Sequence, residues 1–403
     1  MKKKSIVSAL CVLFFSMLLA LPARVSADAI PTDPTYGTTV TVTSGTNIPE
    51  GWVITYYDGI IYRLTYTVGA SYRDTFNIEA NSPIPAGWVL TYANGINDGY
   101  EITYTGGASY RSTIDILANS EIPEGWVLTD AYGNGGYRIM YTVGAGYRDT
   151  IDILANSPIP AGWVTTTDYG NSYRITYMVG EASYRETMTI VSESPVPAGW
   201  VRIYYNSYND TYVITYTGGA SYRDTIDIIA NSTIPAGWVL TYANGNGGYR
   251  IMYTVGAGYR DTIDIIANSP IPEGWILTYA NGSGGYRIMY TVGAGYRDTI
   301  DIIANSPIPA GWVLIYANGN GGYRIMYTGG ASYRDTMDII ANSPIPAGWV
   351  LTYADGNGGY RITYTVGASY GDTMDIIANS PIPEGWVVTE NYGNSSFQIT
   401  YTG

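Results

Sequence analysis

Residues 258–292 read GYRDTIDIIANSPIPEGWILTYANGSGGYRIMYTV, and this stretch decides the fold because close copies of it fill most of the chain. Successive tryptophans are 36 to 38 residues apart, so each copy has one. Such a period is typical of repeat proteins, in which a single repeat cannot bury its apolar face without its neighbours. The tryptophans are Trp52, Trp88, Trp126, Trp163, Trp200, Trp238, Trp275, Trp312, Trp349 and Trp386.

The phase of the repeat follows from one distance. Sixteen residues separate the tyrosine of the Tyr-Arg-Asp-Thr stretch from the next tryptophan, and the same distance separates Tyr36 from Trp52. The first repeat therefore begins at Tyr36, and ten repeats of about 37 residues fill residues 36–403 as one continuous repeat domain. Residues 28–35 form a short lead-in.

Each repeat predicts three β-strands, because β-branched and aromatic residues dominate and no helical period is present. In the repeat that starts at Tyr222, the strands are expected at about 225–229, 238–243 and 249–255. Asn244-Gly245 between the second and third strands is a strong hairpin signal, since both residues tolerate a positive φ. The proline-containing segment between the first and second strands has a fixed length and predicts a rigid, extended corner.

The predicted fold is therefore an all-β tandem array of ten three-stranded repeats. An open β superhelix or rod is favoured, and a closed, propeller-like ring is the runner-up. A parallel β-helix is disfavoured, because its strands do not need a hairpin turn. The distance between Tyr36 and Gly403, measured by solution scattering, would separate the rod from the ring.

Strict alternation within the strands predicts one apolar face. We expect the opposite face to be mixed and only partly covered by neighbouring repeats. The residues expected on the apolar face of this repeat are Ile226, Ile228, Trp238, Leu240, Tyr242, Tyr249, Ile251, Tyr253 and Val255.

Residues 1–27 have the three parts of a secretory signal peptide. Lys2, Lys3 and Lys4 precede an apolar stretch at 6–21, and Val25-Ser26-Ala27 supplies small residues at the expected cleavage point. Cleavage leaves 16 arginines against 33 carboxylates, a net charge of −17. This charge argues against nucleic acid as a partner, and cleavage leaves no integral membrane segment. The predicted location is extracellular, with non-covalent attachment to the cell surface as a further option.

The composition excludes most catalytic chemistry. The chain has no histidine, and its one cysteine, Cys11, lies in the predicted signal peptide. The common nucleophile–base pairs and most metal sites cannot be built from what remains. The Asn-Gly turn mostly lacks carboxylates, which argues against calcium there. We predict that the protein is not an enzyme and has no catalytic, cofactor-binding or metal-binding residues.

A polar row in each repeat is the candidate ligand face. Its members in the sixth repeat are Arg223, Thr225 and Asp227 along one strand face and Arg250 on the same side of the sheet. Tyr242 and Tyr249, which flank the Asn-Gly turn, are added to this candidate face because their hydroxyls are expected at its rim. The alternative is a solvated face with cross-strand ion pairs, which contribute little to stability. The ten tryptophans also offer rings for sugar stacking, but each follows the rigid corner on the predicted apolar face. We therefore predict that they are structural anchors.

Two functions fit these observations. The first is a secreted bacterial repeat protein, adhesin-like or lectin-like, that binds an extracellular or cell-surface polymer multivalently. A glycan is the favoured polymer, since ten weak sites acting together give useful avidity. The alternative is a structural matrix, coat or self-assembling surface protein without a small ligand.

Overall fold

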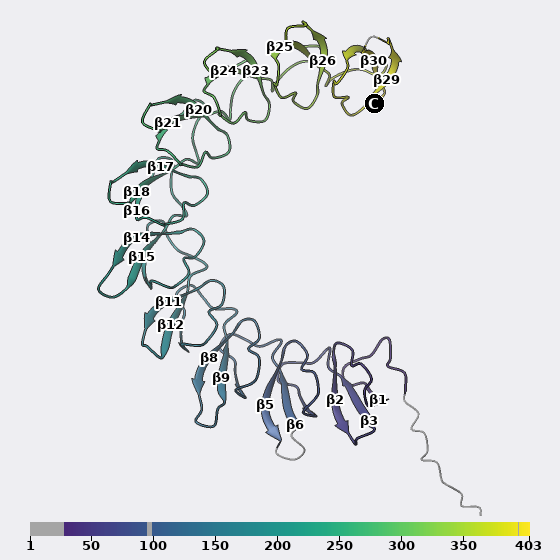
Figure 1. Ribbon diagram of the computed structural model, residues 1–403, viewed down its shortest axis with the longest axis vertical. Coiled ribbons are helices and arrows are strands. Elements are labelled where there is room, and N and C mark those ends of the chain that lie inside the picture. The colour runs from purple at the N-terminus through teal and green to yellow at the C-terminus, as the bar shows by residue number, and fades with distance from the viewer. Residues whose placement is uncertain (1–27, 95–98, 394) are drawn as a thin grey trace, which may run out of the picture. The chain divides into compact units, whose positions relative to one another are not determined.

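The computed structural model describes residues 28–94, 99–393 and 395–403. The predicted signal peptide, residues 1–27, lies outside the described residues. The described part of the chain contains thirty strands and no helix. The strands form ten three-stranded antiparallel sheets, one per repeat (Figure 1). The predicted all-β tandem fold is therefore confirmed.

The three strands recur in the same order in every repeat. The first strands are β1 (Thr39–Thr43), β4 (Thr75–Ile78), β7 (Thr113–Ile116), β10 (Thr150–Leu154), β13 (Thr187–Val191), β16 (Thr225–Ile228), β19 (Thr262–Ile265), β22 (Thr299–Ile302), β25 (Thr336–Ile340) and β28 (Thr373–Ile377). The second strands are β2 (Trp52–Tyr57), β5 (Trp88–Asn94), β8 (Trp126–Ala131), β11 (Trp163–Asp168), β14 (Trp200–Asn206), β17 (Trp238–Ala243), β20 (Trp275–Ala280), β23 (Trp312–Ala317), β26 (Trp349–Ala354) and β29 (Trp386–Asn391). The third strands are β3 (Ile61–Tyr66), β6 (Gly99–Tyr104), β9 (Tyr137–Tyr141), β12 (Ser172–Tyr177), β15 (Thr211–Tyr216), β18 (Tyr249–Tyr253), β21 (Tyr286–Tyr290), β24 (Tyr323–Tyr327), β27 (Gly359–Tyr364) and β30 (Ser396–Tyr401).

The third strand is central in every sheet. In the sixth repeat the order is β16-β18-β17, so β17 and β18 form the predicted hairpin and β16 pairs with the other edge of β18. The side chain of Asn244 holds the hairpin turn, because its Oδ1 accepts hydrogen bonds from the backbone N–H groups of Asn246 and Gly248. This local bonding explains why Asn-Gly predicts the turn.

The chain divides into two compact units. One consists of residues up to Ala161 together with Tyr169–Ile175, and the other of Gly162–Asp168 together with Thr176–Gly403. The first compact unit contains repeats 1 to 3, and the second contains repeats 5 to 10. The fourth repeat contributes to both.

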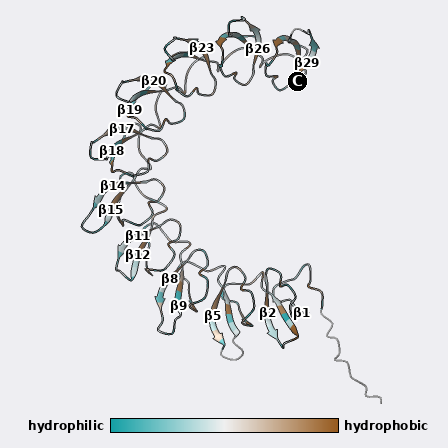
Figure 2. Ribbon diagram, viewed as in Figure 1, coloured by the Kyte–Doolittle hydropathy of each residue, from teal (hydrophilic) through white to brown (hydrophobic). Residues whose placement is uncertain are grey.

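The core of a repeat includes a residue of the repeat before it. In the seventh repeat, Trp275, Leu277 and Ile288 pack with the two isoleucines of β19 and with Val239 of the sixth repeat. Val239 is fully buried, although it lies on the face of its own sheet that was expected to be mixed. Single strands accordingly have both hydrophobic and hydrophilic stretches (Figure 2). Adjacent repeats thus share a core, which is the stacking that a 37-residue repeat needs.

The glycine before each tryptophan is required by its conformation and by its neighbours. Gly237 has a φ of 81°, and a Cβ there would lie 3.1 Å from both Tyr253 Cε2 and Val255 Cγ2. The carbonyl oxygen of Gly237 accepts the hydroxyl of Thr254 at 2.8 Å. Next to it, the rings of Trp238 and Tyr253 pack with centroids 5.2 Å apart. The Gly-Trp pair therefore closes the end of the hairpin opposite the turn.

The expected position of Tyr242 on the apolar face is wrong. A β-bulge between Leu240 and Tyr242 makes Tyr242 oppose Arg250 instead of the next core residue. One extra residue in a strand reverses the alternation of side chains beyond it. The side chain of Tyr242 is therefore 56% exposed on the polar face. The same register shift recurs in repeats 1 to 3, 5 and 7 to 10.

Two strand ends also differ from the prediction. β18 ends at Tyr253, after which Thr254 is buried and Val255 is exposed, so Val255 does not belong to the apolar face. β16 ends at Ile228, and the backbone N–H of Ile229 donates to the carbonyl of Arg202 in the fifth repeat. Both differences lie at a strand end, where the chain leaves the sheet of its own repeat.

Candidate functional site

Asp227 and Arg250 form the centre of the candidate ligand face. They lie directly opposite each other on β16 and β18, and Arg250 donates from Nε at 2.7 Å and from Nη2 at 3.0 Å to the two carboxylate oxygens. These hydrogen bonds hold the pKa of Asp227 below its usual range. Both side chains are about half exposed or more, so the pair contributes little to stability. It remains accessible to a ligand.

The same bidentate ion pair recurs in five other repeats. The pairs are Arg138–Asp115, Arg174–Asp152, Arg287–Asp264, Arg324–Asp301 and Arg361–Asp338. Repeats 1, 2, 5 and 10 lack the Asp–Arg combination: the facing residues are Thr41 and Arg63, Asn77 and Glu101, Thr189 and Val213, and Asp375 and Gln398.

The bulge brings an aromatic ring to this pair. Tyr242 lies opposite Arg250 in the register of β17 and β18, on the same face as Asp227. Its counterparts Tyr279, Tyr316 and Tyr353 are 56 to 57% exposed, so repeats 6 to 9 present four equivalent rings. An exposed ring beside paired hydrogen-bonding groups is the chemistry that sugar recognition uses: the ring packs on C–H groups and the charged groups bind hydroxyls.

Arg223 does not continue the row of Thr225 and Asp227, so its predicted place in that row is wrong. It has a φ of 69° in the turn Ser221–Asp224, whose first and last residues are joined by a backbone hydrogen bond of 2.9 Å. Its guanidinium donates to the carbonyl oxygen of Thr262 in the seventh repeat at 3.2 Å. A turn residue at positive φ redirects the side chain, and β16 begins only at Thr225. Arg223 therefore connects two repeats.

Tyr249 and Thr225, the two remaining members of the candidate ligand face, are both half-buried. Tyr249 is half-buried and packs against the apolar cluster of Ile226 and Ile228, so it does not present its ring at the turn. Thr225 lies opposite Met252 and is half-buried. The structure thus brings Asp227, Arg250 and Tyr242 together, and it separates Arg223 and Tyr249 from them.

None of the ten tryptophans presents its indole for stacking. Their exposed fractions lie between 1 and 6%, and each packs against a tyrosine of its own repeat with centroids 5.1 to 5.5 Å apart. This burial is what the anchor hypothesis requires.

The serine before the prolines joins adjacent repeats, which reasoning from the sequence missed. Ser269 Oγ accepts the backbone N–H of Leu240 in the preceding repeat at 2.8 Å and donates to the carbonyl of Pro270. The other such serines are Ser82, Ser120, Ser157, Ser194, Ser232, Ser306, Ser343 and Ser380. Its presence at one position in repeats 2 to 10 was the available signal.

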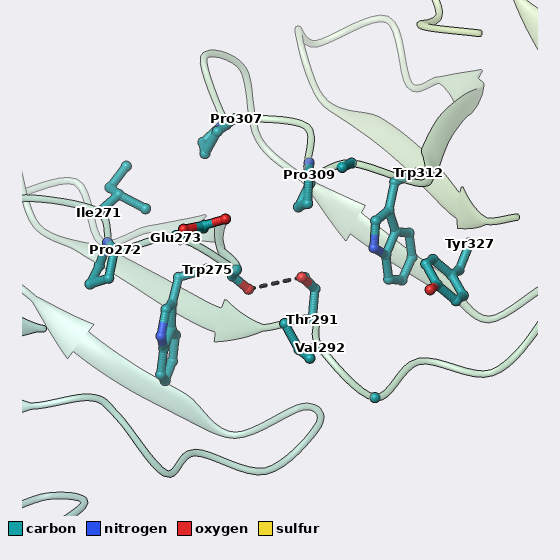
Figure 3. Close-up of a pocket in the computed structure, with 13 residues that line it drawn as sticks. Ile271, Pro272, Glu273, Trp275, Thr291, Val292, Pro307, Pro309, Trp312 and Tyr327 are labelled. Carbon is teal, nitrogen blue, oxygen red and sulfur yellow. Dashed lines mark hydrogen bonds between the residues drawn. The ribbon is translucent and has the colours of Figure 1, made fainter. Parts of the chain in front are cut away.

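A shallow apolar groove lies where the corners of adjacent repeats meet. Between the seventh and eighth repeats it measures about 380 Å³ and is lined by Pro272, Pro307, Pro309, Val292 and the edges of two tryptophans (Figure 3). Equivalent grooves lie between repeats 6 and 7 and between repeats 8 and 9. Because their walls offer few polar groups, these grooves suit apolar contacts.

Within the described ranges, no group of three or more Asp, Glu, His or Cys side chains is placed to hold a metal ion. No helix in this part of the chain is long and apolar enough to span a membrane. Compared with protein-family models, curated proteins and solved structures, the chain matches none of them.

Proposed function

We propose that this is a secreted bacterial binding protein, adhesin-like or lectin-like, that holds an extracellular or cell-surface glycan along the polar face of repeats 6 to 9. The observation that carries the proposal is the exposed tyrosine beside a paired arginine and aspartate, present four times in succession. The charge of −17 calculated for residues 28–403 favours a polymer that is not strongly anionic. The proposal describes a binding protein without catalytic activity.

The chemistry of the pair supports a hydroxylated ligand. Arg250 uses two of its five N–H groups on Asp227, and the carboxylate retains free lone pairs. Vicinal sugar hydroxyls can therefore both donate and accept at the same pair, while the ring of Tyr242 covers the C–H face. Each site alone is expected to bind weakly, in the millimolar range, and four sites engaged together raise the apparent affinity by orders of magnitude.

A pull-down on immobilised polysaccharides tests the proposal. We expect the wild-type protein to bind at least one polysaccharide, and the variant with Tyr242, Tyr279, Tyr316 and Tyr353 all changed to serine to lose that binding. Tyr208→Ser is the matched control, because Tyr208 is 94% exposed but lies in the turn of the fifth repeat. Undiminished binding by the fourfold variant would refute the role of this face.

A structural role is the second candidate, and the apolar grooves favour it. Val255, Val292 and Val366 are 56 to 57% exposed, and the first two line such grooves. Exposed apolar surface at a fixed period suits self-association into a matrix or coat. If no polysaccharide binds and light scattering shows assembly that increases with concentration, this second function replaces the first.

A further inference from the structure

A polar pocket lies between the second and third repeats, inside the first compact unit. Its volume is about 450 Å³, within the range of small-molecule sites. The walls come from the turn and strands of the second repeat and from β7 and β9 of the third. The lining residues are Arg73, Thr75, Thr91, Thr103, Thr113, Ile114, Asp115 and Arg138.

The pocket is rich in hydroxyl groups, and its lining has two guanidinium groups and one carboxylate. Arg138 is paired with Asp115 at 2.8 Å, and the guanidinium of Arg73 donates to the carbonyl oxygen of Thr113 at 2.9 Å. Thr91 Oγ1 donates to the carboxylate of Glu101 at 3.2 Å, and Glu101 itself does not line the pocket. Asp115 and the carbonyl oxygen of Thr113 thus already accept hydrogen bonds from the two guanidinium groups, which favours an uncharged, hydroxylated ligand over an anion.

Arg73 is held at the pocket by a strained backbone. Its φ of 70° is a conformation that residues other than glycine rarely adopt. In the first and last repeats the same position is glycine, Gly37 and Gly371. The strain places a guanidinium between two repeats, where its remaining N–H groups can donate to a bound molecule.

One residue distinguishes this junction from its copies. Thr103 lies opposite Thr75, whereas Met252 lies at the same position opposite Thr225. Met252 packs against the core cluster that the sixth and seventh repeats share, at the place where Thr103 leaves space. Met140, Met289 and Met326 occupy this position in the third, seventh and eighth repeats.

Other repeats also have threonine at the position of Thr103, but their junctions lack either the threonine equivalent to Thr91 or the Asp–Arg pair of the following repeat. At the junction of repeats 1 and 2 the pair is missing, because the second repeat has asparagine and glutamate at these two positions. The fifth repeat has Ile203 where the second has Thr91, and the tenth has Gln398 in the arginine position. In the sequence, only the junction of repeats 2 and 3 combines both threonines with a following Asp–Arg pair.

We propose that this pocket is a discrete binding site for a neutral, polyhydroxylated ligand of one to two sugar rings. This inference rests on the proposed glycan-binding function and gives the polymer one site of higher selectivity than the tyrosine row. The threonine hydroxyls and the Arg138–Asp115 pair bind ring hydroxyls, and Ile114 supplies an apolar contact.

The test is isothermal titration calorimetry of residues 28–403. The probes are the methyl glycosides of glucose, galactose, mannose and N-acetylglucosamine, each titrated separately. We expect one of them to bind with a stoichiometry of one, and Thr103→Met to weaken it at least tenfold. Four repeats already have methionine at this position, so the variant is expected to fold, as circular dichroism will check. Met252→Thr is the reciprocal variant, and it should open a second site and raise the stoichiometry to two.

Each result separates the pocket from the proposed function. If the polysaccharide pull-down succeeds but no methyl glycoside binds, or Thr103→Met binds as well as the wild type, the pocket proposal is overturned and the tyrosine row stands. Stronger binding of glucuronate than of any neutral glycoside overturns the assignment to a neutral ligand. If neither polysaccharide nor glycoside binds, both proposals are wrong.

Discussion

The two faces of each sheet differ in how much their residues vary from repeat to repeat. On the packed face, the tryptophan and its tyrosine partner recur in all ten repeats, and the serine before the prolines recurs in repeats 2 to 10. On the solvent face, the residue at the position of Asp227 is threonine, asparagine or aspartate, and its partner is arginine, glutamate, valine or glutamine. The packed face of the seventh repeat forms its core together with Val239 of the preceding repeat, so a change there affects the packing between two repeats. A change at the exposed positions of the opposite face, those of Asp227, Arg250 and Tyr242, removes no core contact, and these positions are therefore free to acquire binding groups.

The largest effect is expected from truncating a packed tryptophan. Trp275 is 2% exposed and belongs to the core that includes Val239 of the preceding repeat. Trp275→Ala should lower the free energy of unfolding by about 3–5 kcal/mol, measured by urea denaturation. Tyr279→Ala on the solvent face is the control and should leave stability nearly unchanged. Equal effects of the two variants would contradict the distinction between the faces.

A smaller loss is expected at the serine that joins repeats. Ser306 Oγ accepts the backbone N–H of Leu277 at 2.9 Å, and Ser306→Ala leaves that donor without this partner. The cost of an unsatisfied, partly buried N–H is about 1–3 kcal/mol. Hydrogen exchange should accelerate at the amide of Leu277. Ser283→Ala, in the exposed turn, serves as control, and unchanged exchange at Leu277 would show that the serine does not protect it.

The turn arginine tests the cost of its backbone conformation. Arg260 has a φ of 67° and donates to Thr299 in the next repeat. Arg260→Ala removes the contact and retains the strain, whereas Arg260→Gly removes both. The glycine variant should be more stable than the alanine variant by about 1 kcal/mol, because glycine adopts positive φ without steric cost. Thermal melts of the two proteins measure the difference, and the opposite order would argue against strain.

The smallest effect is expected from the exposed ion pair. Arg287 lowers the pKa of Asp264, so the pair stabilises the folded state above the pKa of the unfolded chain and loses this contribution as pH falls through the lower, folded value. Asp264→Asn should therefore lower the melting temperature slightly at pH 7, and the difference should disappear as the pH falls below the lowered, folded-state pKa of Asp264. A difference that persists at low pH would assign the effect to packing.

The strands and turns could be predicted from the sequence because their causes are local. The alternation in 225–228, the Asn244-Gly245 turn and the tryptophan after the corner act within a few residues. The placement of Asp227 and Arg250 on one side of the sheet was also predicted, and the pairing of β16 with β18 brings them opposite each other. Both predictions depend on interactions inside one repeat.

The bulge before Tyr242, the positive φ of Arg223 and the bond from Leu240 to Ser269 could not be predicted in the same way. The guanidinium of Arg223 and the N–H of Leu240 donate to atoms of the next repeat, 39 and 29 residues away in the sequence. The bulge has no residue signature in this chain, and it moves Tyr242 to the opposite face. For these reasons the ligand face was predicted with two members, Arg223 and Tyr249, that the structure places elsewhere.

The sequence by itself determined the repeat, its period, its three strands and the burial pattern of the first strand, because hydrophobic alternation and turn chemistry act over short distances. Only the tertiary structure decided which face each tyrosine occupies and which groups meet across a junction. Those outcomes depend on how one repeat packs on the next. The tryptophan that marks every repeat lies in the shared core, and the groups available to a ligand lie on the other side of the sheet.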